Sequence, residues 1–111
     1  MIYTSKLPEI SLPNSDLASI VLTRAAELGD RPALIDAPSG RTFSYNELAT
    51  QIRHFSTGLA KRGFNKGDVF AIFMPNAPEY AVAFLGVAAA GGVNTTVNVL
   101  YSEQDLLHQL K

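Results

Sequence analysis

The sequence predicts an α/β fold in which a βαβ unit with parallel strands is flanked by helices and accompanied by a small antiparallel hairpin. Three observations carry this prediction. The run at 69–74 is apolar without alternation, which is typical of a parallel strand buried on both faces. An apolar helical segment separates it from a second strand at 93–97, and strand, helix and strand in this order make a right-handed crossover. The residues of a tight turn, Ala37-Pro-Ser-Gly40, separate two further short strands.

Length and composition indicate one small globular domain. The chain has 111 residues, of which 47% are hydrophobic and 17% charged, with a net charge of -1. Nine basic and ten acidic residues give no electrostatic footprint for nucleic acid or an anionic membrane surface. The absence of cysteine excludes disulfides and thiolate metal sites, and is compatible with a reducing compartment.

Residues 1–15 are expected to form an irregular N-terminal arm, because they contain two prolines and no apolar period. The start shows no basic stretch followed by an apolar one, so no secretory signal is expected. The longest uncharged apolar run, at 81–93, contains three glycines and is shorter than the ~20 residues of a spanning helix. These observations predict no membrane span and a cytoplasmic location.

The first folded elements are predicted within residues 16–44. Asp16 caps a helix that ends at Gly29, where Asp30-Arg-Pro32 turns the chain. The strands at 33–36 and 41–44 then form the hairpin. The expected apolar side of the first helix consists of Leu17, Ile20, Val21, Ala25 and Leu28.

The second helix has the clearest local signals. Ser44-Tyr-Asn-Glu47 matches the capping box, in which a serine hydroxyl and a glutamate carboxylate each bind a free amide. Gly63 is placed to close the helix in the left-handed conformation. One apolar stripe follows the box, made by Leu48, Ile52, Phe55 and Leu59.

The stretch Phe73-Met-Pro-Asn-Ala-Pro-Glu-Tyr80 predicts the turn inside the βαβ unit. Pro75 cannot donate to a sheet, so the strand should end near Met74. Asn76 is expected as N-cap of a helix at 77–90, with Glu79 as its return partner and Pro78 in the first turn.

A last helix should open at Ser102-Glu-Gln-Asp105, with Leu106, Leu107 and Leu110 apolar. Its pattern is cut at Lys111, and a parallel sheet requires cover on both faces that these few helices do not supply. The expectation is that residues 16–111 are the incomplete front of something longer.

The glycine-rich stretches of the sequence do not match either common nucleotide-binding motif. Gly86-Val-Ala-Ala-Ala-Gly91-Gly92 superficially resembles a phosphate loop, but it lacks the lysine and hydroxyl residue and closes a helix instead of opening one. A structural role is therefore favoured. No GxGxxG fingerprint of a dinucleotide site is present.

Single candidate residues also have structural explanations. His54 and His108 lack neighbouring partners at ligand spacing, which favours solvated or rim positions. Asn94-Thr95-Thr96 matches the glycosylation sequon but is interpreted as strand chemistry, because no secretory signal is expected.

The hydroxyl and acidic candidates are assigned to helix caps in the same way. Ser44 and Ser102 are caps before they are nucleophiles, and Glu47 and Glu79 are cap partners before they are acids or bases. Asn76 has slightly more functional weight, since loops at the carboxyl ends of parallel strands line ligand crevices. Even there a structural turn is favoured, so no catalytic, cofactor-binding or metal residue is assigned.

The order of several segments along the chain is more specific than any single residue. The segments are Asp30-Arg-Pro-Ala-Leu-Ile-Asp36, Thr42-Phe-Ser-Tyr-Asn-Glu-Leu48, Gly58-Leu-Ala-Lys-Arg-Gly63, Lys66-Gly-Asp-Val69, Met74-Pro-Asn-Ala-Pro-Glu-Tyr80, Ala83-Phe-Leu-Gly86, Ala90-Gly91, Val93-Asn-Thr-Thr-Val-Asn-Val-Leu-Tyr101 and Asp105-Leu-Leu-His-Gln-Leu110. Taken in this order, they resemble the opening of adenylate-forming acyl-CoA synthetases, and most closely 4-coumarate–CoA ligase-type enzymes. The similarity covers 16–111, as the front part of a larger adenylation domain.

The resemblance implies a two-step reaction for the parent enzyme. A carboxylic acid attacks the α-phosphate of ATP with Mg²⁺ assistance, giving an acyl-adenylate and pyrophosphate, and the thiol of coenzyme A then displaces AMP. The family's phosphate loop ending in Pro-Lys-Gly, its Tyr-Gly-x-Thr-Glu segment, its ribose-binding aspartate and its catalytic lysine have no counterpart in these residues. The resemblance therefore transfers no site residue, and the segment alone is expected to be inactive.

Two alternatives stay open. One is another branch of the superfamily, such as a fatty-acyl-CoA or luciferase-like ligase, because the acid pocket lies outside these residues. The other is a non-enzymatic α/β interaction module. The expected partner is the remainder of its own chain or a second copy, through exposed apolar faces.

Overall fold

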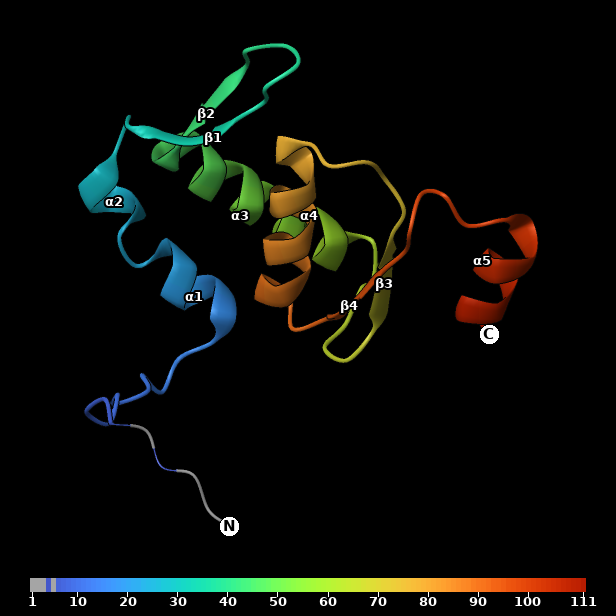
Figure 1. Ribbon diagram of the computed structural model, residues 1–111, viewed down its shortest axis with the longest axis horizontal. Coiled ribbons are helices and arrows are strands. Elements are labelled where there is room, and N and C mark those ends of the chain that lie inside the picture. The colour runs from blue at the N-terminus through green and yellow to red at the C-terminus, as the bar shows by residue number, and fades with distance from the viewer. Residues whose placement is uncertain (1–3, 5) are drawn as a thin grey trace.

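The computed structural model describes residue 4 and residues 6–111. Figure 1 shows a central group of helices with the hairpin on one side and the parallel strand pair on another. The elements in chain order are α1 (Leu17–Leu22), α2 (Ala25–Leu28), β1 (Pro32–Ile35), β2 (Thr42–Ser44), α3 (Tyr45–Lys61), β3 (Val69–Ile72), α4 (Pro78–Ala89), β4 (Val93–Thr96) and α5 (Glu103–Gln109).

The predicted βαβ unit is confirmed. β3 and β4 are parallel neighbours in the register Val69 opposite Val93 to Ile72 opposite Thr96, with α4 as the crossover. β3 ends at Ile72, two residues before the expected end near Met74. The Ile72 carbonyl accepts the Val97 amide at 2.9 Å, and β4 itself ends at Thr96, so the ladder stops there.

The predicted hairpin is also confirmed, with β1 antiparallel to β2. Its turn is closed by the Asp36 amide donating to the Arg41 carbonyl at 2.8 Å and the Gly40 amide donating to the Asp36 carbonyl at 2.7 Å. Ala33 and Leu34 of β1 pack against the core that α3 and α4 form.

The core lies where α3 meets α4. Leu48, Ile52 and Leu59 of the predicted stripe are buried, and Phe55 is half-buried. The capping box at the start of α3 is formed, with the Glu47 amide 3.2 Å from the Ser44 hydroxyl and the Ser44 amide 2.8 Å from the Glu47 carboxylate. Gly63 closes the helix at φ 86°, as expected.

The single first helix of the prediction is wrong. Asp16 is its N-cap, as expected, but the chain forms two helices, separated at Arg24, whose ψ of 1° interrupts the α-helical path. The buried side chains are Ala18 and Ala25. Small side chains allow α1 to lie close to α4. The larger Leu17, Ile20 and Val21, which were expected to be buried, are between 43% and 51% exposed.

The predicted cap of α4 is wrong as well. The N-cap is Ala77, in an extended conformation, and it makes no side-chain cap hydrogen bond. Pro78 occupies the first turn as expected, which places Glu79 one position too early for a capping box. Asn76 is exposed and lies outside the helix.

The fifth helix opens with the expected cap. Ser102 and Asp105 form a reciprocal capping box, and Leu107 and Leu110 are exposed. The radius of gyration is 17.0 Å, against about 13 Å for a compact domain of this length. The division into an arm (1–15) and a domain segment (16–111) stays a prediction. Within the described residues, no helix combines the length and the hydropathy that crossing a bilayer requires.

Candidate functional site

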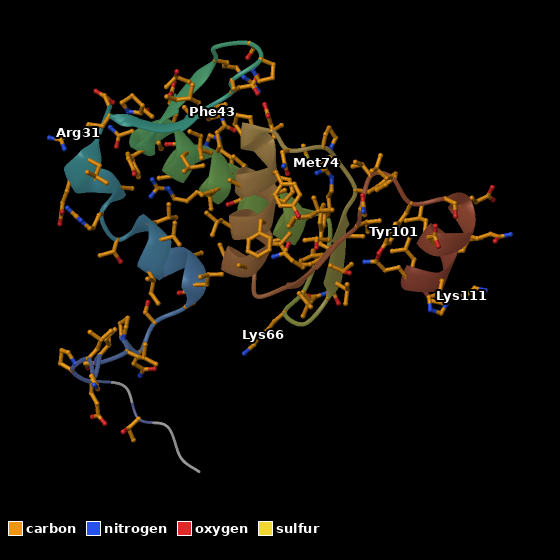
Figure 2. All side chains as sticks on the ribbon, viewed as in Figure 1. Arg31, Phe43, Lys66, Met74, Tyr101 and Lys111 are labelled. Atoms are coloured by element: carbon orange, nitrogen blue, oxygen red, sulfur yellow. The ribbon has the colours of Figure 1, made fainter. Side chains whose placement is uncertain are left out.

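The best-placed hollow for a ligand lies at the carboxyl ends of β3 and β4, where open α/β sheets bind ligands. We call it the strand-end crevice. The loops that leave both strands form its walls, and its volume is about 480 Å³. Figure 2 shows Met74 at this end of the sheet and Tyr101 between the sheet and α5. The lining residues are Met74, Pro75, Asn76, Tyr80, Thr96, Val97, Asn98, Val99 and Tyr101.

The lining offers hydrogen-bonding groups but no charge. Two amides, two phenols and one threonine hydroxyl can orient a polar ligand. Asn98 already uses its side-chain oxygen to accept the Leu100 amide at 3.0 Å. The lining has no cation to bind phosphate and no carboxylate to bind a metal ion. The strand-end crevice can therefore position a molecule, but its side chains cannot stabilise phosphate charge in a transition state.

A second hollow adjoins the first and shares Thr96 and Tyr101 with it. Its volume is about 500 Å³, and α5 contributes Asp105, His108 and Gln109. Hydrogen bonds from the Ser102 hydroxyl and amide hold the pKa of the Asp105 carboxyl below its ordinary value. Because these bonds also cap α5, the carboxylate has a structural role in this position.

Two of the glycines in the segment that superficially resembles a phosphate loop pack closely against aromatic rings. A Cβ on Gly86 would lie 2.7 Å from Phe55, and one on Gly92 would lie 2.4 Å from Phe64. Asn94 lies in β4, with its side-chain amide donating to the Phe84 carbonyl of α4 at 2.9 Å, in agreement with the strand interpretation.

The remaining candidates are spread over the fold. Of the candidate residues, Asn76 lines the strand-end crevice, His108 lines the second hollow, and Thr96 of the sequon lines both. Ser44 and Glu47 cap α3, and His54 is exposed on α3. Among the described residues, no three or more His, Cys, Asp or Glu side chains gather in a set that could hold a metal ion.

The residues present do not fit the nucleotide and metal that the resemblance implies. The described chain offers no cluster of acidic ligands for Mg²⁺. The strand-end crevice also has no lysine or arginine to face a triphosphate. No step of an adenylation reaction is therefore assigned to these side chains.

Sequence reasoning missed the other polar residues of the strand-end crevice. Asn98 follows β4 as Asn76 follows β3, so the same rule would have found it. Tyr80 and Tyr101 gave no such signal, because their place depends on how α4 and the last loop pack. The ion pair of Arg41 with Glu79 was also missed, since 38 residues (79 − 41) separate the partners.

The topology and the strand-end crevice define a class of protein: the first part of an open α/β domain with a ligand crevice at the carboxyl ends of its parallel strands. Its family follows from its similarity to known proteins. The AMP-binding enzyme family matches residues 21–111, which is most of the chain. The chain belongs to this family.

Curated relatives are similar over nearly the whole chain. The chain is 38% identical to "4-coumarate--CoA ligase 3" of Oryza sativa subsp. japonica, over 98% of this chain and 20% of the relative. It is 37% identical to "4-coumarate--CoA ligase 3" of Arabidopsis thaliana, over 99% of this chain and 20% of the relative. The chain thus spans about a fifth of these relatives.

Solved structures agree with the expected fold. The N-terminal subdomain of Klebsiella oxytoca NpsA, in complex with anthranilyl-AMSN, matches with a TM-score of 0.80 at 28% identity, over 86% of this chain and 24% of that one. A benzoate CoA ligase from Burkholderia xenovorans LB400 matches with a TM-score of 0.81 at 26% identity, over 86% of this chain and 19% of that one. The fold prediction, the front part of a larger adenylation domain, is confirmed.

Proposed function

We propose that this chain supplies the first part of the large adenylation domain of an acid–CoA ligase. The parent enzyme would join a carboxylic acid to coenzyme A through an acyl-adenylate, with ATP, Mg²⁺ and coenzyme A as its reactants and cofactor. The observation that carries the proposal is the match of nearly the whole chain to one fifth of 4-coumarate–CoA ligases. A cytoplasmic location stays a prediction.

A 4-coumarate-like aryl acid is the favoured substrate. The relatives at 37–38% identity are 4-coumarate–CoA ligases. The solved structures above 25% identity include a benzoate CoA ligase and NpsA with anthranilyl-AMSN. A fatty acyl CoA synthetase of Mycobacterium tuberculosis matches at 23% identity, which supports the fold alone. The fatty-acyl alternative therefore has the weaker support.

The segment by itself contributes scaffold and crevice wall. Its uncharged strand-end crevice has hydrogen-bonding groups that suit the positioning of a small polar molecule. The charges that stabilise the phosphoryl transition state would come from the rest of the domain. We therefore propose that the isolated chain releases no pyrophosphate from ATP.

A chimera tests the proposal. Residues 1–111 of this chain replace the matching segment of the rice 4-coumarate–CoA ligase 3, and pyrophosphate release is measured with 4-coumarate, benzoate and a long-chain fatty acid. The expected result is turnover by the chimera with an aryl acid, and none by the isolated chain. A folded but inactive chimera, or turnover by the 111 residues alone, would overturn the proposal. The aryl-acid assignment is tested on the complete parent enzyme, because the acid pocket lies outside these residues. A preference of that enzyme for the fatty acid over the aryl acids would overturn the assignment.

The alternative, a non-enzymatic interaction module, has one observation in its favour: the described residues contain no cluster of His, Cys, Asp or Glu that could hold a metal ion, and the strand-end crevice is uncharged. It requires the chain to fold alone as a compact unit. The exposed apolar side chains and the extended dimensions are evidence against that requirement.

A further inference from the structure

One face of the β3–β4 sheet is packed and the other is open. Phe70 of β3 makes edge-to-face contacts with Phe55 and Phe64, with ring centroids 5.8 and 6.3 Å apart. Successive side chains of a strand point to opposite faces. Val69 and Ala71 therefore point away from the helices, and the register places Val93 opposite Val69 on the same face.

These three residues, Val69, Ala71 and Val93, make what we call the open sheet face. Val69 is 64% exposed and Val93 is 51% exposed, and Ala71 is exposed too. Parallel sheets are normally covered on both faces, which is why their strands are continuously apolar. The apolar run of β3 thus has the composition of a strand covered on both sides, with only one side covered here.

Helix α5 reaches this face at Thr95, opposite Ala71, but it leaves Val69 and Val93 uncovered. Its Gln109 side-chain amide donates to the Thr96 carbonyl at 3.0 Å and to the Thr95 hydroxyl at 3.2 Å. Both contacts lie at the carboxyl end of β4, whereas Val69 and Val93 lie at the amino end. Within residues 4 and 6–111, neither β3 nor β4 has a second strand neighbour.

The size of the open sheet face argues against a second copy as its cover. Two strands of four residues, at roughly 3.3 Å per residue and about 4.8 Å between strands, present on the order of 130 Å². A stable dimer buries about 800 Å² on each partner. This area requirement does not apply to a segment of the same domain, because other contacts within the domain also hold that segment in place.

The relatives of this chain contain further segments that could cover the open sheet face. The curated relatives are about five times as long as the part that this chain matches. In the solved structures, the equivalent of this chain is only 24% of an N-terminal subdomain. We propose that the open sheet face is the docking surface for the part of a family adenylation domain that lies outside the matched segment. This inference rests on the proposed function.

Binding in trans tests the inference. The tagged 111-residue chain is co-expressed with the rice 4-coumarate–CoA ligase 3 lacking its matching segment, and the complex is measured by co-purification and sedimentation. Val69→Lys and Val93→Lys place a charge in the contact, so each should weaken binding on the order of tenfold or more. Ile35→Lys is the matched control, because Ile35 is also a strand residue, 66% exposed, on the other sheet.

A second measurement uses both parts in one chain, in case the truncated rice ligase does not fold without its first segment. In the chimera described above, Val69→Lys should lower the melting temperature and Ile35→Lys should leave it nearly unchanged. Equal effects of the two substitutions, on binding in trans or on the melting temperature of the chimera, would overturn the inference. A homodimer of the 111-residue chain that Val69→Lys dissociates would also overturn it. A Val69→Lys-sensitive complex without activity would contradict the proposed function and support the docking surface.

Discussion

Arg41, at the end of the hairpin turn, forms an ion pair with Glu79 in the first turn of α4, with 2.6 Å between Nη2 and Oε1. The guanidinium also lies over the Phe43 ring, 5.2 Å from its centroid. This pair ties the hairpin to the βαβ unit. The Glu79 carboxylate, which the sequence predicted to be the capping-box partner of Asn76, is thus bound to Arg41 instead.

The first prediction is a modest coupling between these two charges. Both side chains are about half exposed, so solvent screens the pair and the coupling free energy should be below about 1 kcal/mol. A double-mutant cycle with Arg41→Gln and Glu79→Gln, read by denaturant unfolding, measures it. The value should fall in 1 M salt, where the screening length is roughly 3 Å.

The pair of Arg24 and Glu27 provides the control for that cycle. It joins neighbours within one short segment and is more exposed, at 71% and 66%. Its coupling should be smaller, about 0.3 kcal/mol. A cycle at Arg41 and Glu79 that gives zero, or a value insensitive to salt, would contradict the structural role of the ion pair.

The second prediction contrasts two helical glycines. Gly86→Ala adds a Cβ 2.7 Å from the Phe55 ring and 3.1 Å from its Cβ, which the ring cannot avoid by rotating. Overpacking costs about 1–3 kcal/mol, more than the helix propensity of alanine returns. Gly58→Ala meets nothing within 4 Å inside α3, in the turn before the Arg62 C-cap, and should stabilise the chain by about 0.5–1 kcal/mol.

Urea unfolding of both variants checks the contrast. The free energy of unfolding should fall for Gly86→Ala and rise for Gly58→Ala. If both variants are stabilised, α3 and α4 are not in the close contact described here.

The third prediction concerns acid. The pKa of Asp105 is lowered because its charged form accepts hydrogen bonds from Ser102. A group with a depressed folded pKa stabilises the fold above its unfolded value of about 3.9, and this contribution is lost as the pH falls through the folded pKa. α5 should therefore fray below about pH 4.

Titration of the carboxyl carbons by NMR measures this effect. Ser102→Ala removes the hydroxyl donor and should raise the pKa of Asp105 toward its ordinary value. The pKa of Asp16, which Ser19 lowers in the same way at α1, should not change in that variant. An unchanged pKa of Asp105 would show that the Ser102 hydroxyl is not one of its hydrogen-bond donors.

The elements that the sequence predicted correctly are those with local causes. The α3 helix has its cap and its stripe within the same residues, from Ser44 to Leu59. β3 is apolar throughout, and β4 is β-branched at three of its four positions. One crossover helix separates the two strands, which leaves parallel pairing as the outcome.

The predictions were wrong where the structure of a segment depends on the elements packed against it. Ala18 and Ala25 are buried because α1 and α2 lie close to other helices, and the period of the apolar residues cannot predict how close the partner comes. The cap of α4 moved by one residue, because Ala77 is the last extended residue before Pro78. In the strand-end crevice, Asn76 was predictable from its place after a strand, whereas Tyr80 and Tyr101 depend on tertiary packing.

The last prediction is that the isolated chain binds a hydrophobic fluorescent dye in its native buffer. Among the large side chains that the structure describes, only Ile52 and Val87 are fully buried, and Leu17 and Ile20 of α1 are 51% and 43% exposed. Small domains are short of buried area, and exposed apolar patches of this kind normally mark an interface.

Substitution of the α1 surface should reduce the signal. The double variant Leu17→Ser with Ile20→Ser removes apolar area without touching the core that α3 and α4 form, so dye fluorescence should fall while the helix signal in circular dichroism persists. Lys61→Ser, at the exposed end of α3, is the control and should leave the fluorescence unchanged. A dye-silent wild-type chain that melts cooperatively as a monomer would contradict this prediction. Such a result would favour the independent interaction module, because a chain that binds no dye does not expose a large apolar surface that another segment would have to cover.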